Sequence, residues 1–377
     1  MLMFTKKLLL TIALFVIGCG IALGQPVGGA IIYATNYGVV ANTGADETVA
    51  LQNAVSACDG VILQLPAGEI NISSTISSTT QCIIRGTGSQ AAFSAPAYPA
   101  TIINQTVAGQ GVFSFTTLNG VVLRDLGIDM PLGAAGAGIS IQSGVSNNLN
   151  RGSHIENVSV WGGGTGIFLF HCANYTIRDS FILNFSSIGI YAGTDSNMPD
   201  IGDSEISGNT IWDFNITTGV AGLRLDPQAG VEVVGNKFLS ADFAIWLTIS
   251  SGPTGTLNIA QNSLEQQTVA HIYVQQATAG ATYADITITG NEMENYGISS
   301  FQDGITIANN TSEYLSDLAI TGNTIRDCGT LYGMVDVQAV VGATITGNVL
   351  DGCGSGSPGI VLGGNAQSVV ESGNVQH

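Results

Sequence analysis

Basic residues are scarce in this 377-residue chain. Nine Lys and Arg stand against 27 Asp and Glu, and the formal net charge at pH 7 is −18. Nucleic-acid-binding proteins need a basic surface to neutralise phosphates, and this chain lacks the residues for one. The same imbalance disfavours unaided binding of a polyanion. We therefore expect no nucleic-acid partner.

Several catalytic signatures are also missing. The chain contains no Cys/His cluster with the ligand spacing of a zinc site. It contains neither a G-x-S-x-G nucleophile motif nor a phosphate-binding loop. The sequence therefore does not support zinc binding, a serine nucleophile of that kind or phosphate binding.

Long apolar runs are confined to the N-terminus. The run from Leu8 to Ile17 follows two lysines and precedes small residues up to Gly24, which is the pattern of a secretory signal over residues 1–24. It only just reaches the lower limit for a membrane span, and no other segment could cross a bilayer. The segment Val16-Ile-Gly-Cys19 also resembles a lipoprotein cleavage box, which would lipidate Cys19. We expect a secreted or periplasmic protein with no membrane span after processing, and lipidation at Cys19 as the alternative.

What the chain has in abundance is repetition, above all of a tetrapeptide related to Ile-Thr-Gly-Asn. Its first residues, including degenerate copies upstream, are 22 to 32 residues apart. Units of that length cannot bury their apolar faces alone and must stack as a solenoid. The anchoring residues are Leu123, Ile155, Ile177, Ile206, Val233, Ile259, Ile288, Ile320 and Ile345. The six clearest copies end at Asn209, Asn236, Asn262, Asn291, Asn323 and Asn348.

A second apolar segment, usually Gly-Ile-x-Leu, lies between successive copies. Its apolar and variable residues alternate, which is the period of a β-strand. A third short strand follows each recurring Asn, as in Asn323-Thr-Ile325. Three short strands per repeat describe one coil of a parallel β-helix. The Gly-Ile-x-Leu segments begin at Gly138, Gly166, Gly189, Gly222, Ala244, His271, Gly304, Met334 and Gly359.

The recurring Asn has two interpretations. Stacked about 4.8 Å apart on neighbouring coils, the side-chain amides can donate and accept hydrogen bonds along a ladder. Alternatively they are solvent-facing turn residues, because Asn tolerates sharp bends. The predicted fold is the same in both cases.

Cysteine use is consistent with export. Cys328 and Cys353 each lie five residues past a recurring Asn, so they should occupy equivalent positions on adjacent coils, within disulfide range. Cys58 and Cys82 are a second candidate pair across the N-terminal cap, which leaves Cys172 unpaired. The alternative is that all five are small buried thiols.

One segment, residues 46–58, has the pattern of an amphipathic helix, with Asp46 as its expected N-cap. A helix there would plug the open end of the solenoid, whose edge strands would otherwise recruit other chains. The expected buried face comprises Val49, Ala50, Ala54, Val55 and Cys58.

The N-terminal third resembles the opening pattern of the pectate-lyase-superfamily β-helix domain. The matching segments are Asn36-Tyr-Gly38, Ala45-Asp-Glu-Thr48, Ala50-Leu-Gln-Asn-Ala54, Val61-Ile-Leu-Gln-Leu-Pro-Ala-Gly68, Ile84-Arg-Gly-Thr-Gly88 and Thr101-Ile-Ile103. That domain occurs in rhamnogalacturonase-like enzymes, phage tailspikes and epimerase-like proteins. The resemblance covers residues 31–130, and it is specific for fold rather than chemistry. With it, the prediction is an all-β protein, a right-handed single-stranded parallel β-helix of about 11–12 coils with an N-terminal capping helix, forming one domain over residues 25–377.

The functional motifs of the best-known branches of that family are not found. Polygalacturonase-like hydrolases carry N-T-D, D-D, G-H-G and R-I-K, and the chain lacks these as a set. The segment Leu225-Asp-Pro-Gln228 resembles the D-P-H-E motif of mannuronan epimerases, but Gln228 occupies the place of the His. That departure removes a proton-transfer residue, so the sequence does not predict an epimerase.

Strand alternation predicts which side chains point outward from the Gly-Ile-x-Leu sheet. In this family that sheet commonly forms a polysaccharide groove, and flat rings suit the apolar faces of sugars. The alternative is that the aromatic residues pack under the loops at 142–153, 194–203 and 213–220. The expected outward pairs are Ser140/Gln142, Phe168/Phe170, Tyr191/Gly193, Arg224/Asp226, Trp246/Thr248, Tyr273/Gln275, Thr306/Ala308 and Asp336/Gln338. The expected substrate-binding residues are Phe168, Phe170, Tyr191, Trp246, Tyr273 and His171.

Asp226 is the expected general acid of a glycoside hydrolase, with Asp195 as base and Arg224 orienting the substrate or Asp226. One coil spacing and two strand residues put the Cα atoms of Asp195 and Asp226 roughly 8 Å apart. Inverting glycosidases hold their acid and base about 6.5–9.5 Å apart. Competitors for the base are Asp200, Asp203 and Glu205. Alternatively, Arg224 and Asp226 are an exposed surface pair.

Further residues and activities remain open at this level. His171 is either a proton-transfer assistant or a structural strand-end residue, and Arg151 and His154 are placed to reach over the groove. No metal or cofactor is expected for a hydrolase. A polyuronate lyase, which would use Ca²⁺ held by the acidic residues, is the second candidate. A non-catalytic glycan-binding surface protein is the third. The sugar, the linkage and the oligomeric state are not predicted.

Overall fold

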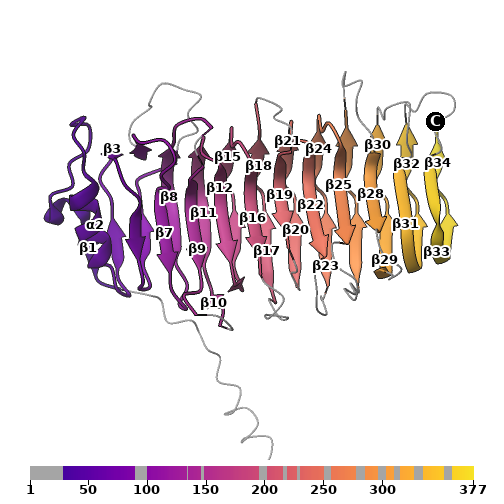
Figure 1. Cartoon of the computed structure of the whole chain (residues 1–377), viewed down its shortest axis with the longest axis horizontal. Coiled ribbons are helices and arrows are strands. Elements are labelled where there is room, and N and C mark those ends of the chain that lie inside the picture. Colours follow the sequence, from indigo (N-terminus) through magenta and orange to yellow (C-terminus); the bar gives the residue numbers. More distant parts are fainter. Residues whose placement is uncertain are drawn as a thin grey trace, which may run out of the picture.

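The computed structural model describes residues 29–89, 100–133, 135–145, 148–194, 202–214, 219–226, 230–249, 256–276, 285–295, 303–309, 315–326, 334–351 and 359–377. Over these residues the chain winds into a rod of stacked coils, from the N-terminal coils at one end to the C-terminal coils at the other (Figure 1). The strands pair in parallel with those of the preceding and following coils. The predicted right-handed parallel β-helix is confirmed.

Three walls make up the rod, and the first wall carries the Gly-Ile-x-Leu segments. Its strands are β4 (Ile76–Ser78), β7 (Phe113–Thr116), β9 (Ala137–Gln142), β12 (Thr165–Phe170), β16 (Ile188–Gly193), β19 (Ala221–Leu225), β22 (Phe243–Ile249), β25 (Ala270–Gln276), β28 (Asp303–Asn309) and the first residues of β31 (Val335–Thr346) and β33 (Ile360–Ser372).

The second and third walls carry the Ile-Thr-Gly-Asn copies and the strands that follow them. The second wall contains β1 (Ile31–Tyr33), β2 (Ile62–Gln64), β5 (Ile83–Arg85), β14 (Thr176–Arg178), β17 (Ser204–Ser207), β20 (Val231–Val234), β23 (Leu257–Ala260), β26 (Ile286–Thr289), β29 (Leu315–Thr321) and the later parts of β31 and β33. The third wall contains β3 (Gly68–Ile72), β6 (Thr101–Gln105), β15 (Phe181–Leu183), β18 (Thr210–Trp212), β21 (Lys237–Leu239), β24 (Ser263–Glu265), β27 (Glu292–Glu294), β30 (Thr324–Arg326), β32 (Val349–Asp351) and β34 (Val375–Gln376). Two longer strands, β8 (Val122–Asp129) and β11 (His154–Trp161), run from the second wall into the third.

The anchoring residues of the repeat stand in one column of the second wall. Leu123, Ile155 and Ile177 are Cα partners on successive coils, and the column continues in register to Ile345. Their side chains are buried in a core that extends along the rod. The spacing of the repeats therefore predicted the register correctly.

The recurring Asn residues form a buried ladder at the corner between the second and third walls. Each Nδ2 donates to the Oδ1 of the Asn on the next coil, over 2.9–3.1 Å, from Asn209 to Asn374. The rungs from Asn209 to Asn348 are at most 1% exposed, so the solvent-facing alternative is wrong. The bend itself falls on the preceding residue, for example Gly290 at φ 64° and Gln261 at φ 56°.

The N-terminal cap is helical, but its details differ from the prediction. Helix α2 (Thr48–Ser56) begins later than expected, with Glu47 at the N-cap position and no capping bond from its side chain. Asp46 still accepts the Thr48 backbone N–H at 3.0 Å. Ala54, Val55 and Cys58 of the expected face are buried, but Val49 is 73% exposed and Leu51 is buried instead, where α2 packs against β4 and the short 3-10 helix η1 (Ala34–Tyr37).

One disulfide stabilises this end of the rod. Cys58 and Cys82 are bonded, with their Cα atoms 5.2 Å apart, which confirms that pair. Cys172 is a buried free thiol in the two-stranded sheet of β10 (Asn150–Arg151) and β13 (Cys172–Ala173), and burial raises its pKa to about 12. Cys328, Cys353 and residues 1–24 with Cys19 lie outside the described residues.

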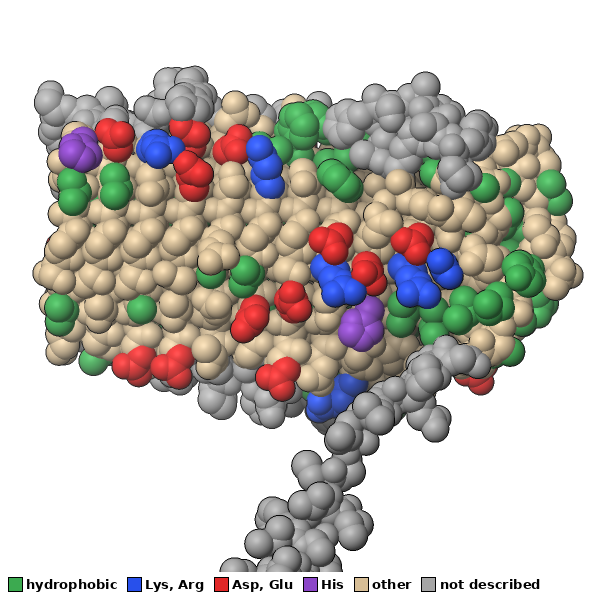
Figure 2. Space-filling view, turned by 180° about the vertical axis from the view of Figure 1, so that it is seen from behind, with side chains coloured by type: hydrophobic (Ala, Val, Ile, Leu, Met, Phe, Trp, Pro, Cys, Tyr) green, Lys and Arg blue, Asp and Glu red, His purple; other side chains and the backbone are tan. Residues whose placement is uncertain are grey.

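Charged side chains on the long side of the rod shown in Figure 2 gather in small groups of both signs among uncharged ones. Ion pairs on the second and third walls include Arg178–Glu156 at 2.8 Å and Lys237–Glu265 at 3.0 Å. Both pairs are solvent-exposed, so each contributes only about 0–1 kcal/mol. Within the described part of the chain, no helix has the length and apolar character needed to cross a membrane.

Candidate functional site

The outward side chains of the first wall form the column that strand alternation predicted. Successive coils place them in Cα register, and polar residues continue the column to Ser114 and Ser77 at the N-terminal end. The predicted part of the column is Ser140, Phe168, Tyr191, Arg224, Trp246, Tyr273, Thr306 and Asp336.

Aromatic rings in this column contact one another in two groups. Phe168 stacks on Tyr191 with ring centroids 5.0 Å apart and planes 10° apart, and Phe170 lies 6.1 Å from Phe168. Towards the C-terminus, the Trp246 and Tyr273 rings are 6.2 Å apart. All five rings are half-buried, so each keeps an exposed part.

A further aromatic residue, Phe243, joins the second group. Its ring lies 5.0 Å from Trp246 and 5.1 Å from Tyr273. Alternation did not predict it, because Phe243 precedes the Gly-Ile-x-Leu pattern by one residue and reaches the rings from the edge of the wall. The Nε1 atom of Trp246 is buried and has no hydrogen-bond partner among the described residues.

Arg224 lies between the two aromatic groups and contacts both. Its guanidinium carbon is 4.8 Å from the Trp246 ring centroid and 5.9 Å from that of Tyr191. Such contacts attract a cation to the ring face. Arg224 is the sole Lys or Arg in the first-wall strands that the structure describes.

Asp226 accepts hydrogen bonds at both carboxylate oxygens. Tyr191 donates its Oη–H to Oδ2 at 2.7 Å, and Arg224 donates Nε–H to Oδ1 at 3.2 Å. Gly193 on the preceding coil leaves room for the Tyr191 hydroxyl, since a Cβ there would lie 2.2 Å from it. Burial, followed by the hydrogen bond to Asp226, raises the pKa of Tyr191. The Asp226 side chain is only 14% exposed, so the predicted exposed surface pair is instead a partly buried network.

The predicted bases do not gather at this network within the described residues. Asp195 and Asp200 lie outside them. Asp203 and Glu205 line a different pocket of about 410 Å³, together with Glu232, and Asp226 does not line it. The pairing of Asp195 with Asp226 therefore stays a prediction.

Three other residues from the sequence analysis lie outside the first-wall strands. His171 is 5% exposed, in a left-handed turn at φ 54°, and stacks on Phe170 at 4.1 Å. Arg151 donates to Asn174 Oδ1 at 3.2 Å. His154 begins β11 on the second wall, where burial lowers its pKa. Arg151 and His154 thus stand on β10 and β11 rather than on the first wall, and their reach over the groove stays a prediction.

Two carboxyl groups that the sequence analysis did not single out as catalytic lie at the C-terminal end of the same wall. Asp303, 8% exposed, accepts a hydrogen bond from the Thr306 hydroxyl at 2.8 Å through Oδ2. Its Oδ1 is buried without a partner among the described residues. Burial, and the nearby Asp336 carboxylate, raise the pKa of Asp303 to about 6. Asp336 accepts a hydrogen bond from Gln338, and burial raises its pKa as well.

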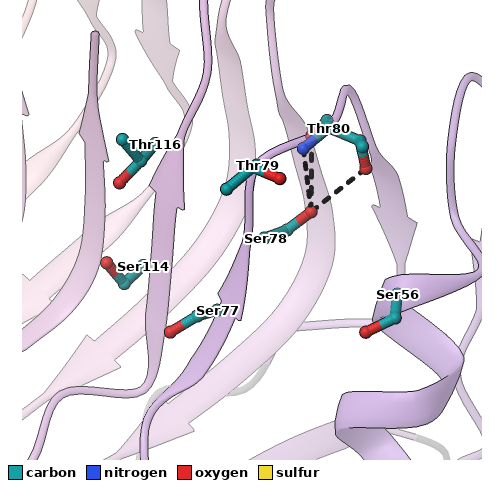
Figure 3. Close-up of a pocket in the computed structure, with 7 residues that line it drawn as sticks. All are labelled: Ser56, Ser77, Ser78, Thr79, Thr80, Ser114 and Thr116. Carbon is teal, nitrogen blue, oxygen red and sulfur yellow. Dashed lines mark hydrogen bonds between the residues drawn. The ribbon is translucent and has the colours of Figure 1, made fainter. Parts of the chain in front are cut away.

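The N-terminal end of the first wall ends in a pocket lined by hydroxyl groups (Figure 3). Ser77 and Ser114 come from paired strands β4 and β7, and Ser56 comes from α2. The pocket has a volume of about 280 Å³, and its lining is completed by Ser78, Thr79, Thr80 and Thr116. From one end to the other, the first wall therefore presents hydroxyl groups, aromatic rings and carboxylates.

A protein-family model matches more than half of the chain. The model described as "Periplasmic copper-binding protein (NosD)" matches residues 72–275. The chain belongs to the NosD family. No curated protein sequence matches it.

Solved structures with the same fold as this NosD-family chain come from several kinds of protein. The Azotobacter vinelandii mannuronan C-5 epimerase AlgE6 A-module matches at TM-score 0.61 and 15% identity, covering 92% of this chain and 99% of that one. A GH87 α-1,3-glucanase catalytic unit from Streptomyces thermodiastaticus strain HF3-3 matches at 0.57 and 14%, covering 94% and 70%. A tailspike protein of E. coli bacteriophage HK620, solved with a pentasaccharide, matches at 0.59 and 11%, covering 92% and 66%. The predicted pectate-lyase-superfamily resemblance is confirmed, and at these identities it shows the fold.

The description of the NosD family names copper, which the side chains of this chain would have to bind. Copper sites use His, Cys and Met ligands. The described residues contain no group of three or more His, Cys, Asp or Glu that could hold a metal ion. His271 is fully buried, and burial lowers its pKa to about 3. The His, Cys, Asp and Glu residues that the structure describes therefore do not fit a copper site.

Proposed function

We propose that this protein is exported and acts on a polysaccharide bound along the first wall, as a glycoside hydrolase. The observation that carries the proposal is the continuous first-wall column, in which aromatic rings flank the Tyr191–Asp226–Arg224 network. Half-exposed rings offer stacking faces for sugars, and the network offers fixed polar groups for their hydroxyls. The signal-like residues 1–24 and the Cys58–Cys82 disulfide support export.

Comparisons with solved structures support a carbohydrate ligand. The epimerase, the α-1,3-glucanase and the tailspike bound to a pentasaccharide share the fold over 92–94% of this chain. The lyase alternative has less support, because it needs a free base and neutralised substrate carboxylates. Arg224 is instead engaged with Asp226 and lies over Trp246.

The hydrogen bonds of Asp226 suit a binding role better than the predicted acid role. A general acid must carry a proton and give it to the leaving oxygen. Asp226 accepts donors at both oxygens, which is the arrangement of an ionised carboxylate. We assign to Asp226, Arg224 and Tyr191 the role of binding a sugar in the middle of the first wall.

The test is incubation of the purified protein with a panel of polysaccharides, with and without a calcium chelator. New reducing ends without unsaturated products, unchanged by the chelator, are expected. Unsaturated products lost on chelation would indicate the lyase. Retention on a polysaccharide column without any cleavage would indicate a binding protein and would refute the hydrolase.

A further inference from the structure

We propose that Asp303 and Asp336, at the C-terminal end of the first wall, are the acid and base that cleave the glycan. The pair is assigned on the basis that the protein hydrolyses a polysaccharide along this wall, as proposed above. It places the chemistry away from the Asp226 network, which then holds a neighbouring sugar.

Stacking of coils brings the two carboxyl groups together. Asp303 is the first residue of β28, and its carboxylate reaches forward along the strand to accept a hydrogen bond from the Thr306 hydroxyl at 2.8 Å. Thr306 is the Cα partner of Asp336 on the next coil, which puts those Cα atoms about 4.8 Å apart. One coil spacing together with the 2.8 Å hydrogen bond puts the two carboxyl groups roughly 5–8 Å apart, which overlaps the range of about 6.5–9.5 Å at which inverting glycosidases hold acid and base with a water between them.

The Asp303 carboxyl group also lacks a hydrogen bond that a ligand could supply. It is 8% exposed and its Oδ1 has no partner among the described residues. A buried polar atom without a partner costs about 1–3 kcal/mol, and a bound ligand that hydrogen-bonds to it removes that cost. Because Oδ1 is buried, a sugar reaches it only when the Asp303 side chain turns as the sugar binds.

The surroundings of the two carboxyl groups assign the role of acid to Asp303 and the role of base to Asp336. Tyr273 on β25 and Asp336 on β31 are the titratable groups that face Asp303, and no Lys or Arg side chain stands on the described strands next to it. Burial and the Asp336 charge favour the protonated form of Asp303, whose pKa lies at about 6. Burial raises the pKa of Asp336 as well, but the hydrogen bond that Asp336 accepts from the Gln338 amide acts in the opposite direction and favours its ionised form. Two carboxyl groups whose environments separate their pKa values supply an acid and a base.

The reaction then balances with one water. Asp303 gives its proton to the glycosidic oxygen as the bond from that oxygen to the anomeric carbon breaks. Asp336 takes a proton from water, whose oxygen bonds to the anomeric carbon. The Tyr273, Trp246 and Phe243 rings, 5.0–6.2 Å apart, offer the adjoining stacking surface for the sugar.

The experiment compares wild type, Asp303→Asn, Asp336→Asn and the exposed control Asp317→Asn on the polysaccharide that wild type degrades. The first two variants are expected to lose about 100-fold or more in kcat, with the control unchanged. Sodium azide, an anionic nucleophile that needs no base, is expected to restore turnover to Asp336→Asn with a glycosyl azide product. It should not restore Asp303→Asn.

A second measurement is independent of turnover. Carbon-13 NMR of carboxyl-labelled aspartate should show one resonance that titrates near pH 6 and is missing from Asp303→Asn. Turnover by either variant within tenfold of wild type, or an Asp303 carboxyl that is ionised from pH 5 upward, would overturn the pair and leave the proposed hydrolase standing. A wild type that cleaves nothing in the panel would refute the hydrolase itself.

Discussion

Two columns of side chains run along the rod in the same register and are built in opposite ways. At the corner of the second and third walls, the same residue recurs on coil after coil, and each Asn amide both donates and accepts. On the first wall, the same stacking brings together unlike residues, and Trp246 Nε1 and Asp303 Oδ1 are left without partners among the described residues. A column of identical, satisfied side chains stabilises the solenoid. A column of unlike, unsatisfied ones has groups available for a ligand.

The largest effect is expected from breaking the ladder. Asn262→Ala removes the acceptor for the Asn236 backbone and side-chain amides and the donor to Val233 O and Asn291 Oδ1. Because each lost hydrogen bond leaves a buried polar group without a partner, the free energy of unfolding should fall by about 4 kcal/mol. The control is Asn258→Ala, a half-buried Asn on β23, the strand just before Asn262. Denaturant midpoints followed by circular dichroism measure both, and equal midpoints would show that the ladder is not stabilising.

The ladder and the walls were predictable because they repeat. Period and alternation placed Ile206, Val233 and Ile259 in one column and Tyr191 beside Arg224. Asn374 was missed because Glu371-Ser-Gly-Asn374 lacks the apolar first residue, yet it accepts from Asn348 at 2.9 Å. Repetition thus predicts position well and fails where one copy has diverged.

The Asp303–Asp336 pair was not predictable in the same way. Asp303 lies three residues before Thr306, at the edge of the wall, and its side chain turns along the strand to reach that hydroxyl. No local pattern signals this, because the neighbours that bury it come from β25 and β31. The same reason hid Phe243, which contacts Trp246 from the edge.

Asp303 should make the stability of the protein depend on pH, which the ladder amides cannot do. Its pKa is raised from 3.8 to about 6 in the folded protein, so the folded state binds the proton more tightly. The stabilising contribution is fully present below about pH 3.8 and is lost as pH rises through about 6. As the pH rises from about 3.8 to about 6, the free energy of unfolding of Asp303→Asn should therefore increase by about 2–3 kcal/mol relative to that of wild type. Denaturant unfolding at a series of pH values measures this difference. If the difference between Asp303→Asn and wild type changed with pH no more than that between Asp317→Asn and wild type, the prediction would be contradicted.

The hydroxyl of Tyr191 tests the middle of the first wall. Tyr191→Phe keeps the ring that stacks on Phe168 and removes the bond to Asp226 Oδ2. A hydrogen bond to a charged group is worth about 1.5–3 kcal/mol, so KM for the polysaccharide should rise roughly tenfold or more with kcat unchanged. Asp226→Asn should act in the same direction. A fall in kcat with unchanged KM in either variant would instead return Asp226 to a catalytic role.

The smallest effect is expected from a single aromatic platform. Trp246→Ala removes a half-buried ring that contacts Arg224, Phe243 and Tyr273. One lost stacking contact should weaken polysaccharide binding by about 1 kcal/mol, roughly fivefold in Kd. Trp161→Ala is the matched control, because Trp161 is also half-buried and contacts the Phe214 ring at 5.5 Å, but it lies where β11 runs along the third wall. Calorimetric titration should show weakening in Trp246→Ala alone, since the first wall is where sugars are expected to stack. Equal weakening in both variants would mean that binding is not confined to the column of unlike side chains.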